Sequence, residues 1–207
     1  MNIESEILKY NVSRETLGKM QEFVGILSEW NEKINLVSKK SLQDVWVRHV
    51  LDSLQLSEYL SPQDKVLLDI GSGSGFPGVV LAIYAAEKLP DMKIILVESI
   101  GKKVVYLRDV CQRLGLNNVE VVQNRVENIK ITADVVTARA VAELSVLLAY
   151  TEKIINKNGK ALFLKGKSYN QEMAVAQGIW NYEADIVSNR YSEEGVILKI
   201  FAIRKRK

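Results

Sequence analysis

The sequence of 207 residues predicts an α/β protein with a mostly parallel sheet that is closed by an antiparallel C-terminal hairpin. Short runs of branched apolar residues, typical of buried strands, alternate along the chain with longer segments of helical periodicity. A glycine-rich stretch directly after the first of these runs lets the backbone turn sharply from strand into helix. Near the C-terminus, residues 184–190 and 196–203 flank a turn at 192–195, which predicts the hairpin.

Composition limits the number of domains and the kinds of site. With 47% hydrophobic residues, the chain fills one full-sized domain, and we expect a helical extension over residues 1–60 packed on a sheet domain over residues 61–207. The single cysteine, Cys111, and the single histidine, His49, argue against a disulfide framework and a metal site. No segment approaches about 18 continuous apolar residues, and no signal peptide begins the chain, so a cytoplasmic protein without membrane contact is expected.

Two helices are expected before the first strand. Apolar residues recur at three- and four-residue steps over about residues 14–34, which predicts the first helix. Ser41-x-x-Asp44 resembles a helix N-cap, and an apolar face continues from there to about Glu58, which predicts the second. Both apolar faces need a partner surface, so these helices should pack on the sheet domain.

The same region is rich in polar and aromatic side chains. Judged by residue type alone, Trp46 packs in the core, His49 is hydrogen-bonded, and Arg48 pairs with Asp52 at i, i+4. Without further information, this structural interpretation is favoured over a role in a substrate cleft.

The most informative stretch is the strand and loop of residues 66–78, Val-Leu-Leu-Asp-Ile-Gly-Ser-Gly-Ser-Gly-Phe-Pro-Gly. In one register, Gly73-x-Gly75-x-x-Gly78 fits the dinucleotide-binding pattern G-x-G-x-x-G. Glu98 ends the next apolar run, where an acid that binds the ribose of such a cofactor belongs. The loop alone is therefore compatible with a nicotinamide-dependent enzyme.

The other register is Gly71-x-Gly73-x-Gly75, with Asp69 two residues ahead, and it resembles the first motif of the Rossmann-like S-adenosylmethionine (SAM) methyltransferases. SAM carries an ammonium group, with which a carboxylate at the strand end can pair. The C-terminal hairpin also favours this class, because a nicotinamide-binding fold would continue in parallel strands and would need a substrate domain for which no residues remain.

The remaining elements follow from alternating strand and helix patterns. Expected strands end near Glu98, Val122, Ala138 and Leu164, and Asn158-Gly159 is expected to turn into the last of them. Because ligands of open parallel sheets bind beyond the carboxyl ends of the strands, residues that follow these strands are candidates for binding. They are Val126 and Glu127 for an adenine ring, and Arg139 and Lys165 on neighbouring strands.

Several motifs together resemble one family, the bacterial methyltransferases of small-subunit ribosomal RNA known as glucose-inhibited division protein B, or RsmG. The matching words span nearly the whole chain in order: Asn35-Leu36, Trp46-Val-Arg-His-Val-Leu-Asp-Ser-Leu54, Leu68-Asp-Ile-Gly-Ser-Gly-Ser-Gly-Phe-Pro-Gly78, Glu98-Ser-x-Gly-Lys-Lys103, Asn124-Arg-Val-Glu127, Ala138-Arg-Ala140 and Leu164-Lys-Gly166. The Pro77-Gly78 pair, joined to the upstream Arg-His-x-x-Asp-Ser, is far more specific than a glycine loop alone.

The resemblance implies a Rossmann-like SAM-dependent methyltransferase with a seven-stranded sheet, which methylates N7 of one guanosine in a conserved loop of 16S ribosomal RNA. Its expected partner is this RNA or the assembling small subunit, and a monomer is expected. Guanine N7 bears a lone pair and no proton, so no general base is required, and positioning should dominate. His49, Arg139 and Lys165 are then the candidates for positioning the substrate.

The family also implies the cofactor contacts. Matched position by position, they are Gly71, Phe76, Val126, Glu127 and Arg139, and the physical argument adds Asp69, Gly73 and Glu98. Three alternatives stay open: a methyltransferase of the same fold that acts on a small molecule, an NAD(P)-dependent reductase, and a non-catalytic RNA-binding module.

Overall fold

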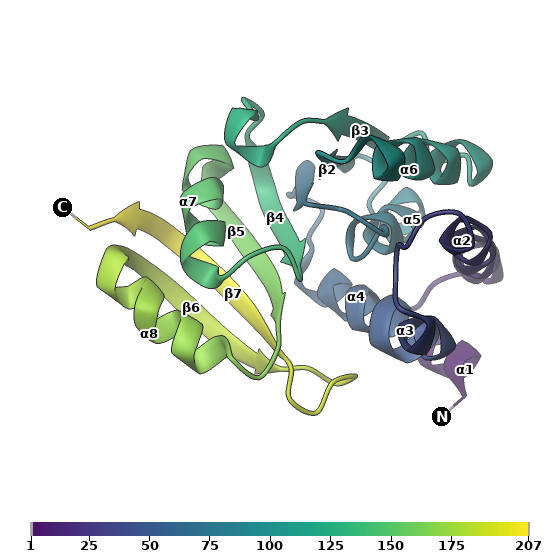
Figure 1. Cartoon of the computed structure of the whole chain (residues 1–207), viewed down its shortest axis with the longest axis horizontal. Helices are drawn as coiled ribbons and strands as arrows, with labels where there is room; N and C mark the ends of the chain where they lie inside the picture. Colours follow the sequence, from purple (N-terminus) through teal and green to yellow (C-terminus); the bar gives the residue numbers. More distant parts are fainter. Residues whose placement is uncertain (1, 207) are drawn as a thin grey trace.

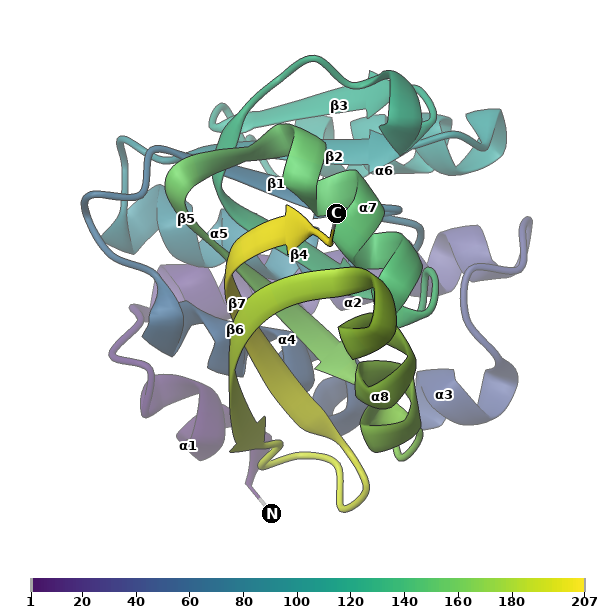
Figure 2. The same ribbon diagram turned by 90° about the vertical axis from the view of Figure 1, so that its left-hand side faces the viewer.

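The computed structural model describes residues 2–206 and contains one seven-stranded sheet in the order β3-β2-β1-β4-β5-β7-β6 (Figure 1). The strands are β1 Val66–Ile70, β2 Lys93–Glu98, β3 Val119–Gln123, β4 Ala133–Arg139, β5 Ile155–Lys165, β6 Trp180–Ser188 and β7 Val196–Lys205. Strands β1 to β5 pair in parallel, whereas β7 is antiparallel to both β5 and β6. The predicted α/β class and C-terminal hairpin are therefore confirmed. Figure 2 shows the β6–β7 edge facing the viewer.

Helices cover both faces of the sheet (Figure 1). They are α1 Ile3–Leu8, α2 Arg14–Asn31, α3 Lys39–Gln43, α4 Asp52–Leu54, α5 Gly78–Lys88, α6 Gly101–Arg113, α7 Leu144–Ile154 and α8 Tyr169–Ile179. Successive strand residues point to opposite faces, so Leu67 packs in the core under α2, α5 and α6, and Leu68 packs in the core under α7 and α8. Within the described residues, none of these helices is both long and apolar enough to cross a membrane.

The N-terminal helices share their core with the sheet. The buried residues of α2 and those of α5 and α6 belong to one hydrophobic cluster. Within it, the ring of Phe23 on α2 packs against Phe76 of the glycine-rich loop, with the ring centroids 5.1 Å apart. Trp30 Nε1 also donates a hydrogen bond of 2.7 Å to Asp109 on α6. The helical segment therefore buttresses the loop directly.

The second N-terminal helix differs from the prediction. Its N-cap is Ser38, which accepts a hydrogen bond from the backbone of Ser41, so the predicted cap at Ser41 is wrong. The chain then breaks into short turns: α3, a π-helix Trp46–Leu51, α4, and a 3₁₀-helix Gln55–Tyr59. The π-helix changes the direction in which successive side chains point, a feature often associated with functional sites. Periodicity alone gives a single continuous helix because it measures only apolar spacing.

Strand β5 also differs from the prediction. Residues 155–165 form one strand, and the predicted turn at Asn158-Gly159 is instead an irregularity in its pairing with β4, between Ile155 and Lys160. Gly159 is required there because a Cβ atom would lie 2.9 Å from the carbonyl oxygen of Asp134. Residues 169–179 form α8, a helix that the sequence pattern does not predict.

Candidate active site

The loop between β1 and α5 is shaped by its glycines. Gly71, Gly73 and Gly75 have φ angles of 64°, 51° and 93°, a region that residues with a Cβ atom rarely adopt. At Gly71 a Cβ would also lie 2.8 Å from Val141 Cγ2. The bare backbone of Gly71 and Gly73 lines a cavity of about 280 Å³, together with Phe76, Lys103, His49 and Arg139.

Glu98 fixes this loop from the end of β2. Its Oε2 atom accepts a hydrogen bond of 3.0 Å from the backbone of Gly73, and its Oε1 atom accepts one of 2.8 Å from the backbone of Ile100. The side chain is buried. Each carboxylate oxygen keeps a further lone pair, so Glu98 is able to accept hydrogen bonds from hydroxyl groups of a ligand beside the loop.

Asp69 lies beneath the loop and does not line its cavity. The hydroxyl of Thr137 donates a hydrogen bond of 2.7 Å to Asp69 Oδ1, whereas Oδ2 has no hydrogen-bond partner within residues 2–206. Burial raises the pKa of Asp69 from its ordinary value of 3.8 to about 6, although the Thr137 bond opposes this. With a pKa of about 6, Asp69 is mostly ionised at pH 7, so the structure holds a buried negative charge next to the loop.

A second cavity, of about 710 Å³, adjoins the first. Ser41, His49, Arg139 and Ala140 line both, so the two cavities meet at these residues. The larger one is also lined by Arg48, Asp52, Lys165 and Asn189. Of the side chains predicted for substrate positioning, His49, Arg139 and Lys165 therefore all border one cleft.

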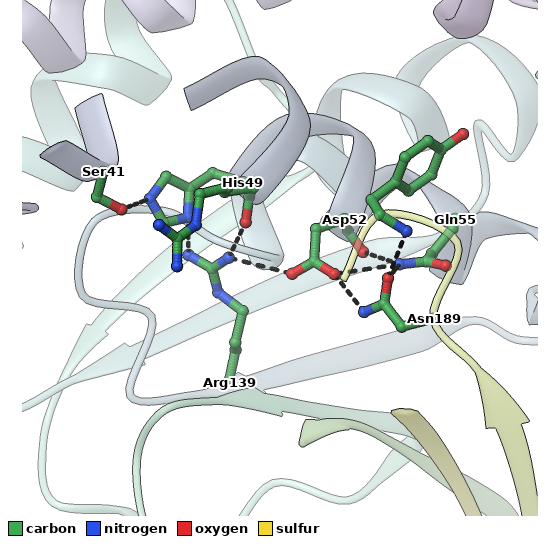
Figure 3. A network of polar contacts seen from close by, with 8 residues as sticks. Ser41, His49, Asp52, Gln55, Arg139 and Asn189 are labelled. Atoms are coloured by element: carbon green, nitrogen blue, oxygen red, sulfur yellow. Dashed lines mark hydrogen bonds and ion pairs between the residues drawn. The ribbon is translucent and has the colours of Figure 1, made fainter. Parts of the chain in front are cut away.

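Arg139 is the centre of the polar network at the junction (Figure 3). Its guanidinium donates hydrogen bonds of 2.8 Å to the Arg48 carbonyl, 3.2 Å to Asp52 Oδ2 and 2.5 Å to His49 Nδ1. The same group lies over the ring of Phe76, 5.3 Å from its centroid. Burial lowers the pKa of Arg139 and the charge of Asp52 raises it, and the guanidinium stays protonated at any physiological pH.

His49 is held in one protonation state. Because Nδ1 accepts a hydrogen bond from the cationic Arg139, Nε2 must bear the proton, which it donates to the hydroxyl of Ser41. The ring stacks on Phe76 with centroids 4.9 Å apart. Burial, with the charges of Arg139 and Arg48, lowers the pKa of His49 to about 3. His49 is therefore neutral, and its Nδ1 lone pair is not free to act as a general base.

We expect nuclear magnetic resonance to detect this state directly. His49 is the only histidine of the chain, so its imidazole signals need no assignment by mutation. The ring ¹⁵N shifts should correspond to the neutral Nε2–H tautomer and should not change between about pH 5 and 8, because the folded pKa of about 3 lies well below this range. A titration near pH 6.5 in the folded protein would contradict the network.

The pKa shifts of His49 and Asp69 affect stability in opposite directions. Between about pH 6.5 and pH 3, His49 is protonated in the unfolded chain but neutral in the folded chain. As the pH falls through this range, the contribution of His49 to the free energy of unfolding therefore decreases. As the pH falls from about 6 to about 4, the folded chain protonates Asp69 before the unfolded chain does, so its contribution increases. The two effects partly offset each other in mildly acidic solution.

The network continues to the C-terminal hairpin, whose sequence carries no sign of a link to the site. Asn189, just after β6, donates a hydrogen bond of 2.5 Å from Nδ2 to Asp52 Oδ1. Gln55 Nε2 donates a hydrogen bond of 3.2 Å to the same oxygen and one of 2.9 Å to Asn189 Oδ1 (Figure 3). Asp52 is thereby held facing Arg139. Nothing in the sequence near Asn189 indicates this role, since its partner lies 137 residues away.

Besides Asp69 and Glu98, which lie next to the loop but line neither cavity, three further predicted site residues are not free at the cleft. The ammonium group of Lys165 forms an ion pair of 2.5 Å with Glu172 Oε2 and donates a hydrogen bond of 3.0 Å to the Ala142 carbonyl. Val126 and Glu127 form a 3₁₀ turn after β3 and line neither cavity. Within residues 2–206, no three His, Cys, Asp or Glu side chains gather in a way that would hold a metal ion.

The fold and the site together define the class of this protein. The sheet order 3-2-1-4-5-7-6, a glycine loop after β1 and a buried acid at the end of β2 are those of a class I SAM-dependent methyltransferase. A solved SAM-dependent methyltransferase from Aquifex aeolicus shares this fold, with a TM-score of 0.60, 14% identity, and coverage of 76% of this chain and 92% of that chain.

The chain belongs to the family described as GidB, rRNA small subunit methyltransferase G, which matches residues 16–194. A ribosomal RNA small subunit methyltransferase G of Ruegeria sp. (strain TM1040) is 42% identical over 199 residues, 96% of each chain. One of Orientia tsutsugamushi (strain Ikeda) is 44% identical over 169 residues, 82% of each. The predicted family, enzyme class and SAM cofactor are confirmed, and the nicotinamide alternative is set aside.

Proposed function

We propose that this protein transfers the methyl group of SAM to N7 of a guanosine in a loop of 16S ribosomal RNA. The family supplies the reaction class and the RNA. The observation that favours N7 as the acceptor is the state of His49, whose Nδ1 is occupied by Arg139 and whose pKa lies near 3. N7 has an in-plane lone pair and no proton, so its methylation needs no base, and this cleft offers none in the form of a histidine.

The residues around the loop fit SAM. Its methionyl end would lie in the 280 Å³ cavity against the backbone of Gly71 and Gly73 and beside Phe76 and Arg139. The positive charge of the ligand is complementary to the buried Asp69 carboxylate beneath the floor. We assign the ribose hydroxyls to Glu98 and the adenine ring to Val126 and Glu127.

When bound, SAM supplies an electrophilic methyl group attached to a positively charged sulfur. The task of this chain is to hold the guanine so that N7 lies in line with that methyl group. Arg139 and His49 are fixed by each other, by Asp52 and by Phe76, so they are preorganised to contact the base or its phosphate. Alignment of two reactants contributes about 7 to 11 kcal/mol to such a reaction.

We assign the walls of the cleft to the two parts of the chain. The helical extension over residues 1–60 contributes Ser41 and His49 to both cavities, and the methyltransferase domain over residues 61–207 contributes Arg139 and Ala140 to both, so cofactor and substrate are each held between the two parts. The protein acts as a cytoplasmic monomer on the RNA or on the assembling subunit. Lys165, whose charge is paired with Glu172, orients the loop after β4 through Ala142 and contacts phosphate only if that pair opens.

The experiment that tests this function compares 16S ribosomal RNA from cells with and without the protein. We expect one N7-methylguanosine to disappear in the deletion strain and to return when purified protein and SAM are added. An unchanged RNA would contradict the proposal and favour a small-molecule substrate. Methylation at another atom of the base would be consistent with 16S ribosomal RNA as the substrate, but it would contradict N7 as the acceptor atom, which we inferred from the state of His49.

A further inference from the structure

A third depression, of about 330 Å³, opens beside the cofactor loop, between the end of α2 and the start of α6. On one side it is lined by Glu32, Lys33, Ile34 and Asn35, and on the other by Ile100, Lys102 and Lys103. We call it the lysine groove. Its side chains come from segments about 70 residues apart, and neither segment alone indicates a binding surface.

The lysine groove is continuous with the candidate active site. Lys103 lines both this groove and the 280 Å³ cavity, and a Cβ atom on Gly73 would lie 3.9 Å from Lys103 Nζ. The 280 Å³ cavity in turn shares His49 and Arg139 with the larger cleft. The larger cleft and the lysine groove therefore lie on either side of the cofactor cavity, and an RNA strand that runs along the rim of this cavity, outside the bound cofactor, has a connected path between them.

The lysines of the groove differ from those at the opposite end of the strands in how their charges are paired. At the amino ends of the strands, lysines are neutralised by carboxylates, as in Lys65–Asp91 at 3.0 Å and Lys160–Asp64 at 2.8 Å. Within residues 2–206, by contrast, none of the three lysines of the groove forms an ion pair, and the groove contains a single carboxylate, that of Glu32. Unpaired ammonium groups beside a cleft favour a polyanionic ligand.

We propose that the lysine groove binds the phosphate backbone of the RNA strand that flanks the methylated nucleotide, through Lys33 and Lys102. This inference rests on the proposed function and names where the RNA leaves the cleft. A nucleotide placed with its base in the cleft carries phosphates on both sides, and the connected path takes one side of the strand to these lysines. Lys33 and Lys102 do not line the cofactor cavity, so their charges are available to RNA while SAM is bound.

The test uses the double substitution Lys33→Gln/Lys102→Gln and leaves Lys103 intact, because Lys103 also faces the cofactor cavity. A matched control, Lys153→Gln/Lys157→Gln, removes two exposed lysines from α7 and β5. Binding is measured at several salt concentrations with S-adenosylhomocysteine present. The RNA substrate is whichever the unmodified protein methylates, the small subunit from a deletion strain or the 16S RNA extracted from it.

We expect the plot of log affinity against log salt to become less steep by about 1.4 in the groove variant, about 0.7 for each lost contact to a single strand. KM for RNA should rise severalfold while kcat and the Kd for SAM stay unchanged, and the control should behave as the unmodified protein. An unchanged salt slope, or a loss of SAM affinity, would overturn the proposal. If the unmodified protein itself fails to methylate 16S RNA, the proposed function fails instead.

Discussion

Arg139→Ala is expected to lower kcat/KM for methyl transfer by about 10²- to 10³-fold, the usual effect of removing one preorganised donor from an active site. Arg139 borders both cavities and holds His49, Asp52 and the Arg48 carbonyl in fixed positions. Arg139→Lys should recover little activity, because one ammonium group cannot satisfy three acceptors arranged around a planar guanidinium. Steady-state methylation of 16S ribosomal RNA measures both variants.

The control separates catalysis from folding. Arg139→Ala leaves the buried Asp52 without its cationic partner, and breaking such a pair costs about 3 to 5 kcal/mol of unfolding free energy. In the double variant Arg139→Ala/Asp52→Asn the uncompensated charge is gone, so stability should largely recover. We expect activity to stay low. A double variant that regains both would show that Arg139 only supports the fold.

The sequence predicts well those parts of the structure that depend on a few neighbouring residues. The first strand and its loop follow from an apolar run and from glycines whose positive φ angles no other residue tolerates well, and the hairpin follows from two short runs around a turn. The edge at which Glu98, Val126 and Arg139 lie follows from the rule that parallel strands end on the same side. Each of these inferences needs only a few neighbouring residues.

The parts that sequence does not predict depend on contacts between distant segments. Ser41 has the residue type of an N-cap, yet Ser38 takes that position and Ser41 is left to hold His49. Lys165 ends a strand at the cleft as expected, but α8 was not foreseen, and it brings Glu172, which pairs with the lysine. Asp69 has the predicted residue type and strand position, but its Oδ1 atom accepts a hydrogen bond from Thr137 on β4 and its side chain does not line the cavity.

The second large effect is expected at Glu98, because this side chain holds the loop and is the residue to which we assign the ribose of the cofactor. Glu98→Gln retains size and replaces one oxygen by an amide group, which donates. Both carboxylate oxygens accept from backbone N–H groups, of Gly73 and Ile100, so whichever position the new amide takes, it meets another donor. Loss of a hydrogen bond to a charged group is worth about 1.5 to 3 kcal/mol, and the Kd for SAM should therefore rise by about 10- to 100-fold.

Isothermal titration calorimetry with SAM measures this effect without RNA, and Glu120→Gln is the matched control. Glu120 lies on the neighbouring strand β3, where its side chain is partly exposed and pairs with Lys93. An exposed pair of this kind contributes little, so Glu120→Gln should bind SAM as the unmodified protein does. If Glu98→Gln bound SAM within twofold of the unmodified protein, the ribose would not be held at the end of β2. The cofactor would then have to lie elsewhere along the loop, although the loop geometry would be unchanged.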